Sequence, residues 1–143
     1  MRNTPIKDIM TPHPIMLNID EPFCKVAQIF KSHDIRHLPV VNSSGVIMGI
    51  ISQRDFNRIT SPQRTSEGEY VYDMDEVAKY ILRQQIIQHV TTLSPEDTLE
   101  RAIELMAEKK LGCIPITDAE LKVVGIVTAV DGLRLFLKIL RGK

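Results

Sequence analysis

The chain has 143 residues, of which 43% are apolar and 25% charged, a composition that supports one compact core. Its 18 basic residues are balanced by 18 acidic ones and only 5% of residues are aromatic, so we expect no nucleic-acid partner. No apolar run approaches the roughly 20 residues of a membrane span, and no signal peptide is visible. The chain is therefore predicted to be cytoplasmic, with no membrane partner.

The sequence contains an internal repeat. A shift of 76 residues lays residues 14–55 over residues 90–131 without a gap, and most of the similar positions pair one apolar residue with another. Five aligned positions are identical: Leu17/Leu93, Pro39/Pro115, Gly49/Gly125, Ile50/Ile126 and Asp55/Asp131. Apolar character retained at low identity is typical of one backbone used twice, so the chain is predicted to be two copies of one unit.

The first copy is predicted to run strand, helix, strand, strand, helix. Its first helix begins near Asp20 and is indicated by four residues at i, i+3, i+4 and i+7: Phe23, Val26, Ala27 and Phe30. Residues 36–41 are predicted to form a short strand. Residues 46–51 are almost continuously apolar, which predicts a buried strand. After Ser52 the pattern becomes helical again.

The segment between the copies has a different composition. Residues 60–72 include Ser61-Pro62 and Gly68 and predict a loop or insertion. Residues 73–85 place four residues on one face and predict a helix: Val77, Tyr80, Ile81 and Gln84.

The second copy repeats the pattern. Ser94 is expected to cap its first helix, with Pro95 at the first helical position and Asp97 three residues after the cap. Strands are expected over residues 113–117 and 123–127. The last helix has one apolar stripe, Leu133, Phe136, Leu137 and Leu140, and further apolar residues off it, Leu135 and Ile139. This pattern indicates that the helix is buried against a partner subunit. The alternative is that it packs on the core of its own repeat.

Two motifs carry the chemistry, Gly49-Ile50-Ile51-Ser52-Gln53-Arg54-Asp55 and Gly125-Ile126-Val127-Thr128-Ala129-Val130-Asp131. Each has glycine, two apolar strand residues, a hydroxyl residue, two variable positions and aspartate. This pattern resembles the ligand signature of cystathionine-β-synthase (CBS) domains. Upstream, His37-Leu38-Pro39-Val40-Val41 and Cys113-Ile114-Pro115-Ile116 resemble the family's Pro-Val strand, and Asp8-Ile9-Met10-Thr11-Pro12 resembles its Met-Thr-Pro element.

The resemblance implies a tandem CBS pair, or Bateman module, of mixed α/β (α+β) class. It consists of two β-α-β-β-α repeats packed about a pseudo-two-fold axis. The boundaries expected are residues 1–60 for repeat 1, 61–78 for a linker or insertion, and 79–143 for repeat 2. Family members commonly bind adenosyl ligands in the clefts between repeats and usually form homodimers.

Ligand contacts follow from the chemistry of these positions. A carboxylate held at a helix start can accept both ribose hydroxyls, and hydroxyl and helix-start amide groups can donate to phosphate. The ribose and phosphate candidates are Ser52, Arg54, Asp55, Thr128, Val130 and Asp131. By family position, adenine would lie against Ile15, Met16, Val40 and Ile50 in the first copy, and against Thr91, Thr92, Ile116 and Ile126 in the second. Asp55 and Asp131 could instead serve only as helix caps.

The copies diverge at the phosphate end. Arg36, His37 and Arg58 offer further phosphate contacts in the first copy, together with Arg54. The second copy has Gly112 and Cys113 at corresponding places and Ile86-Ile87-Gln88 where the first has Met-Thr-Pro. We expect one good site and one weak or empty site. Because the clefts lie between repeats, basic residues of the first copy could also serve the second aspartate.

Other features favour neither metal binding nor catalysis. His33 and His37 are four residues apart, but the helix is expected to end between them, so the zinc-binding geometry fails. Two cysteines cannot form a disulfide framework, and no nucleophile–base pair stands out. We expect neither a metal site nor a catalytic cofactor, and no enzymatic activity.

Two functions remain open at this stage. The first is a regulatory sensor that binds AMP, ADP or ATP and signals to an effector protein whose identity the sequence does not give, with S-adenosylmethionine as the alternative ligand. The second is an interaction or assembly module with empty clefts. Both predict a homodimer, so ligand-dependent stability separates them.

Overall fold

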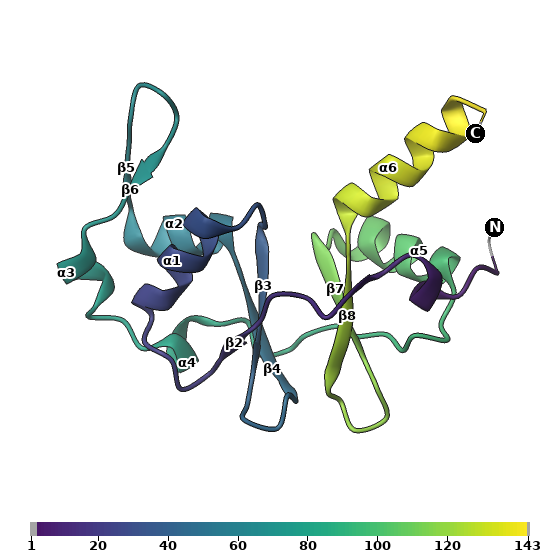
Figure 1. The fold of residues 1–143 in the computed structure, drawn as a ribbon, viewed down its shortest axis with the longest axis horizontal. Coiled ribbons are helices and arrows are strands. Elements are labelled where there is room, and N and C mark those ends of the chain that lie inside the picture. Colours follow the sequence, from purple (N-terminus) through teal and green to yellow (C-terminus); the bar gives the residue numbers. More distant parts are fainter. Residues whose placement is uncertain (1–2, 143) are drawn as a thin grey trace. The chain divides into compact units, whose positions relative to one another are not determined.

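The computed structural model describes residues 3–142, which form two compact units (Figure 1). The first unit is Ile15–His89. The second unit joins the residues up to Pro14 to those from Val90 onwards. This division differs from the expected 1–60, 61–78 and 79–143, because the N-terminal segment packs with the second copy and the intervening segment packs with the first.

The first unit has the predicted order of strand, helix, strand, strand and helix. Its elements are β2 (Leu17–Asn18), α1 (Cys24–Ser32), β3 (His37–Val41), β4 (Ile47–Ser52) and α2 (Gln53–Thr60). The strands form a sheet in the order β2-β3-β4, with β2 parallel to β3 and β3 antiparallel to β4. Val26, Ala27 and Phe30 of α1 are buried, which confirms the predicted apolar face of this helix.

The core of the first unit is rich in aromatic rings. Phe56 of α2 is fully buried, and its ring centroid lies 4.9 Å from that of Phe23 and 5.3 Å from that of Tyr72. The Tyr72 hydroxyl donates to Asn57 Oδ1 at 2.7 Å, and the Tyr80 hydroxyl donates to the carbonyl of Ile59 at 3.2 Å. The segment after α2 therefore completes this core.

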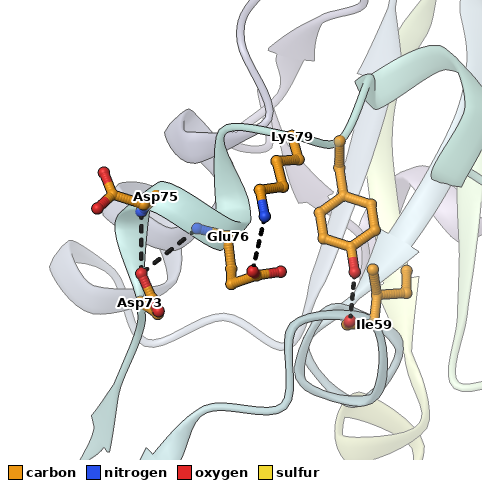
Figure 2. A network of polar contacts seen from close by, with 6 residues as sticks. Ile59, Asp73, Asp75, Glu76 and Lys79 are labelled. Atoms are coloured by element: carbon orange, nitrogen blue, oxygen red, sulfur yellow. Dashed lines mark hydrogen bonds and ion pairs between the residues drawn. The ribbon is translucent and has the colours of Figure 1, made fainter.

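That segment contains a small hairpin, β5 (Gln63–Arg64) with β6 (Tyr70–Val71), and two short helices, α3 (Met74–Val77) and α4 (Leu82–Gln85). The single helix predicted over 73–85 is wrong, because Ile81 has an extended backbone. Figure 2 shows how α3 begins and ends. Asp73 accepts hydrogen bonds from the amides of Asp75 and Glu76, and Lys79 pairs with Glu76 at 2.9 Å.

The second unit repeats the arrangement with a different edge strand. Its elements are a 3-10 helix η1 (Ile6–Asp8), β1 (Thr11–Pro12), α5 (Leu99–Lys109), β7 (Cys113–Thr117), β8 (Val123–Thr128) and α6 (Ala129–Leu140). The sheet order is β1-β8-β7, both pairs antiparallel, and Leu93 forms an isolated parallel bridge with Ile116. Its core is aliphatic and includes Ile6 and Ile114, both fully buried.

The 76-residue repeat is confirmed in backbone register. His37 pairs with Ser52 as Cys113 pairs with Thr128, and each hairpin has an irregularity at the same place, Val40/Val41 and Ile116/Thr117. Both apolar hairpins were predicted from the sequence.

The segment that precedes each repeat in the sequence pairs with the sheet of the other repeat, and we call these two segments, Met10–Pro12 and Ile86–Gln88, the exchanged segments. Thr11 of β1 pairs with Ile126 of β8, and Ile87, 76 residues after Thr11, forms an antiparallel bridge with Ile50 of β4. Gly125 and Gly49 make room for these segments. A Cβ on Gly125 would clash with the Met10 side chain, and one on Gly49 would lie 2.7 Å from the carbonyl oxygen of Ile87.

The N-terminal segment around Ile6 and Lys7 also explains where α5 begins. The predicted start at Ser94 is wrong, since Thr98 caps the helix by accepting from the Arg101 amide. Carbonyls of the preceding turn bind the N-terminal segment instead: Ile6 N–H donates to the Asp97 carbonyl at 2.8 Å, and Lys7 N–H donates to that of Pro95 at 3.0 Å.

Helix α6 has no buried residue, and its apolar side chains are exposed: Val130, Leu133, Phe136, Leu137, Ile139 and Leu140. Gly132 stands where the first repeat has Phe56, so α6 lacks the aromatic anchor of α2. Docking of α6 into the core of its own unit, the simpler of the two expectations, is therefore wrong. No helix within residues 3–142 is long and apolar enough to cross a bilayer.

Candidate ligand site

Both motifs span the end of an antiparallel strand and the start of the helix that follows. β4 ends at Ser52, which caps α2, and β8 ends at Thr128, which caps α6. This geometry places the hydroxyl at the cap and the aspartate at the third helical position of each repeat. The carboxylates thus lie in the first helical turn, where the helix dipole stabilises negative charge.

The first motif leaves its carboxylate lightly bound. Asp55 N–H donates to Ser52 Oγ at 3.0 Å. The Asp55 carboxylate accepts from Arg58 Nη2 at 3.2 Å, and the two side chains are 24% and 73% exposed respectively. Exposed ion pairs of this kind contribute little to stability, so the carboxylate can exchange this partner at small cost.

The second motif is closed by a reciprocal capping box. Asp131 Oδ2 accepts from Thr128 N–H at 2.8 Å and from the Thr128 hydroxyl at 3.0 Å, while Asp131 N–H donates to Thr128 Oγ1 at 3.3 Å. Such a box satisfies two helix-start groups at once. The carboxylate is here part of the helix cap.

More basic residues lie beside the first motif than beside the second. His37 begins β3 opposite Ser52, and the carbonyl of Arg36 accepts from Gln53 N–H at 2.8 Å, so both residues lie beside the start of α2. Burial and the neighbouring Arg36 lower the pKa of His37, and Asp55 partly opposes them. Arg54 is exposed in the first turn of α2.

Three of the four corresponding positions of the second unit, Gly112, Cys113 and Val130, are uncharged, and the fourth is Arg134. Gly112 accepts from Ala129 N–H at 2.9 Å, and Cys113 pairs with Thr128. Burial raises the pKa of the Cys113 thiol to about 12, so it is neutral and unreactive at physiological pH. Val130, the counterpart of Arg54, is exposed on α6.

The residues predicted to contact adenine fall into three groups, which differ in burial and in strand pairing. Ile15 and Met16 are half-buried just before β2, and Thr91 and Thr92 are half-buried just before Leu93. Val40 and Ile116 are fully buried within the cores of their units. Ile50 and Ile126 pair with the exchanged segments: Ile50 and Ile87 exchange both backbone hydrogen bonds, at 3.0 and 3.1 Å.

Two shallow hollows, one on each unit, have linings that include neither aspartate of the motifs. One, of about 310 Å³, lies beside Thr92 and the Ser94–Asp97 turn of the second unit. The other, of about 290 Å³, is lined by residues 19–23 and 80–83 of the first unit. No cluster of three potential metal ligands occurs within residues 3–142.

The sequence analysis did not predict that the exchanged segments pair with β8 and β4. Met10-Thr11-Pro12 and Ile86-Ile87-Gln88 are 76 residues apart, and this spacing was the available signal that they serve equivalent roles. Their difference in sequence obscured the equivalence of their backbones.

Family comparison decides the identity of the fold. The CBS domain model matches residues 6–60 and 75–138, which include both motifs and their sheets. The chain belongs to the CBS-domain family. It is a tandem CBS pair of mixed α+β class, as its resemblance to that family predicts.

Relatives show the same module in larger proteins. MJ1225 of Methanocaldococcus jannaschii is 28% identical over 94% of the CBS pair, which spans 48% of MJ1225. An L-aspartate semialdehyde sulfurtransferase of that organism is 26% identical over 93% of this chain, which spans 23% of the enzyme. The CBS pair thus covers half or less of these relatives.

A solved CBS pair gives the structural comparison. The CBS domain pair of protein MJ0100, crystallised with 5′-methylthioadenosine and S-adenosyl-L-methionine, is 26% identical, with a TM-score of 0.77. The match covers 93% of this chain and 95% of that one.

Proposed function

We propose that this CBS pair is a regulatory module that binds an adenine nucleotide (AMP, ADP or ATP) and signals to an effector protein. The observation that carries the proposal is the cluster at the start of α2. There a lightly bound carboxylate, a capping hydroxyl and several basic side chains surround one helix N-terminus. The exposed guanidinium of Arg58 and the neighbouring Arg36 and Arg54 supply the forked donors that phosphate accepts well.

Each part of a nucleotide has a matching group. The Asp55 carboxylate accepts the ribose hydroxyls, and the Ser52 hydroxyl and the amides of α2 donate to phosphate. Adenine needs a flat apolar surface, for which we propose Ile15, Met16 and Ile50 in the first unit. The equivalent residues of the second unit are Thr91, Thr92 and Ile126. A regulatory CBS pair has at least two conformations, and a ligand shifts the equilibrium between them only if it binds one conformation more tightly than the other. The effector then responds to the change in conformation.

S-adenosylmethionine is the second ligand candidate. The similarity to the MJ0100 pair favours it, since that protein was crystallised with S-adenosylmethionine and a related thioether. The basic cluster favours phosphate, because a sulfonium cation beside Arg36 and Arg58 would be repelled. Direct comparison of the two ligands separates these options.

A role in assembly alone is the second candidate function, and α6 is the observation that favours it. We propose that a second copy of this chain covers the exposed apolar residues of α6 in a homodimer. The helix is apolar on more than one face, so an identical helix can pack against it, and the chain carries no net charge to oppose association. Leu133→Glu with Leu140→Glu should give a monomer by analytical ultracentrifugation; a monomeric parent chain would contradict the dimer.

We further propose a regulatory rather than catalytic role, in the cytoplasm. The thiols of Cys24 and Cys113 are free, which suits a reducing compartment, and the high pKa of Cys113 removes it as a nucleophile.

Thermal unfolding with and without ligand tests the sensor function. The purified chain is titrated with AMP, ADP, ATP and S-adenosylmethionine, with tripolyphosphate as the control for non-specific anion binding. A ligand at about 100 times its Kd stabilises the folded state by roughly 2.7 kcal/mol, which raises the Tm by several degrees. No shift with any adenosyl compound would contradict the sensor function and favour the assembly module.

A further inference from the structure

The hairpin of β5 and β6 belongs to a part of the chain that the repeats do not share. Residues 61–74 lie between the two stretches that match the CBS domain. The hairpin projects from the helices and the sheet of the first unit (Figure 1). It is fixed at its base, because the ring of Tyr72 is buried and its hydroxyl donates to Asn57. An ordered, projecting segment of this kind is a candidate for contact with another molecule.

The two faces of the hairpin differ in chemistry. Arg64 pairs with Tyr70 across the strands, and Gln63 pairs with Val71. Successive side chains of a strand point to opposite faces, so Arg64 and Tyr70 share one face. Gln63 and Val71 lie on the other, and so does Glu69, two residues before Val71. The first face is therefore basic and aromatic.

Two cations lie over aromatic rings on and beside the first face. Arg64 Cζ lies 5.3 Å from the ring centroid of Tyr70, and Nζ of Lys31, on α1, lies 5.6 Å from that of Tyr72. The centroids of the two rings are 6.4 Å apart. We call these four residues the cation–tyrosine face. Contact with a ring restricts a long cationic side chain, so less entropy is lost when that side chain binds an anion.

Both cations keep donors for a further partner. Lys31 and Arg64 are exposed, and within residues 3–142 neither forms an ion pair. The Arg64 side chain donates from Nε to the carbonyl of Gly68 at 3.3 Å. Its two terminal nitrogens remain for a carboxylate, which can accept from both nitrogens at once.

We propose that the cation–tyrosine face binds an acidic segment of the effector protein through Lys31 and Arg64. This inference rests on the proposed function, which requires an effector. Small molecules favour concave pockets, and the hollow of the first unit is lined by other residues. Single-stranded nucleic acid also binds cations and rings, but it needs a longer basic groove, and this chain has no net charge.

Peptide binding by the full chain tests the proposal. The probe is a fluorescein-labelled octapeptide of alternating Glu and Ser, and the control is the same peptide with Gln in place of Glu. Fluorescence anisotropy measures both Kd values. We expect the acidic peptide to bind about tenfold more tightly or better, and its binding to weaken as salt is added, because salt screens exposed charges.

Arg64→Gln and Gln63→Glu form a matched pair of variants. Each lowers the net charge by one, at neighbouring positions on opposite faces of the hairpin. Arg64→Gln should weaken binding of the acidic peptide about fivefold, the upper range for an exposed ion pair, and Lys31→Gln should act in the same direction. Gln63→Glu should change this Kd less than about twofold. All three residues are exposed, so the Tm without ligand should stay unchanged.

Equal binding of the acidic and neutral peptides would overturn the proposal, as would equal weakening by Arg64→Gln and Gln63→Glu. Tighter binding of a single-stranded RNA octamer than of the acidic peptide would overturn it in favour of nucleic acid. Thermal unfolding with AMP and S-adenosylmethionine on the same samples separates the two functions. A ligand shift without peptide binding would remove this surface and leave the sensor, whereas peptide binding without a ligand shift would remove the sensor and support the surface.

Discussion

In the first repeat Phe56 fills an aromatic core between α1 and the inserted segment, whereas Gly132 occupies the equivalent position in the second. The first helix of this pair, α2, is therefore anchored, and α6 is left with exposed apolar residues. The start of each helix differs too, because the Asp55 carboxylate of α2 pairs with Arg58 and the Asp131 carboxylate of α6 belongs to a capping box. The comparison teaches that one backbone can carry different surfaces: the first repeat has more of the basic candidate ligand groups, and the second has an exposed apolar helix.

Loss of the aromatic anchor should have the largest effect. Phe56→Ala removes a fully buried ring that contacts Phe23 and Tyr72, and should lower the free energy of unfolding by about 3–5 kcal/mol. Urea unfolding followed by circular dichroism measures the loss. A change below about 1 kcal/mol would show that the aromatic core is not what distinguishes the first unit.

The two motif glycines should differ in their tolerance of a methyl group. Gly49→Ala meets the backbone carbonyl of Ile87, which cannot move without shifting the strand, and should cost about 1–3 kcal/mol. Gly125→Ala meets only the flexible side chain of Met10 and should cost less. Met10→Ala combined with Gly125→Ala should recover part of that loss in urea unfolding. Equal costs at both glycines would contradict this account of the exchanged segments.

Much of this fold could be predicted from the sequence because its main signal is local. The apolar runs over residues 46–51 and 123–127 define their strands, and the hydroxyl and aspartate of each motif define the helix start that follows. The start of α5 could not be found this way. Ser94-Pro95-Glu96-Asp97 satisfies the rules for a helix start, but its carbonyls bind the N-terminal segment, a contact between residues some 90 positions apart.

The candidate site was predictable only in part. The positions of Asp55 and Asp131 follow from the repeat. Their different partners, Arg58 and Thr128, depend on side-chain rotamers, which the sequence does not show because both motifs have equivalent residues at the cap and the third helical position. The exchange of Thr11 and Ile87 between sheets is similarly hidden, because alternation of polar and apolar residues does not say which strand lies alongside.

Substitution of the helical glycine should stabilise the second unit. Gly132→Ala improves the helix propensity of α6, and its methyl group would lie 3.4 Å from Ile103 Cδ1, an ordinary contact. The free energy of unfolding should rise by about 0.5–1 kcal/mol in urea unfolding. A loss of stability would show that α6 packs more tightly at Gly132 than this structure indicates.

The smallest expected effect is the pH dependence from His37, whose lowered pKa is due mainly to burial and to Arg36. The unfolded chain then binds a proton at higher pH than the folded chain, so the free energy of unfolding falls as pH drops below about 6.5. His37→Gln should flatten this decline between about pH 6.5 and 5. An identical pH profile in the variant would contradict the assigned shift.

The most direct test of the central claim is a ¹H–¹⁵N correlation spectrum of the chain titrated with AMP. The account predicts that the amides of Ser52–Asp55 shift more than those of Thr128–Asp131, because more basic residues lie beside the first motif. Equal shifts at both motifs, or no shift at either, would contradict it.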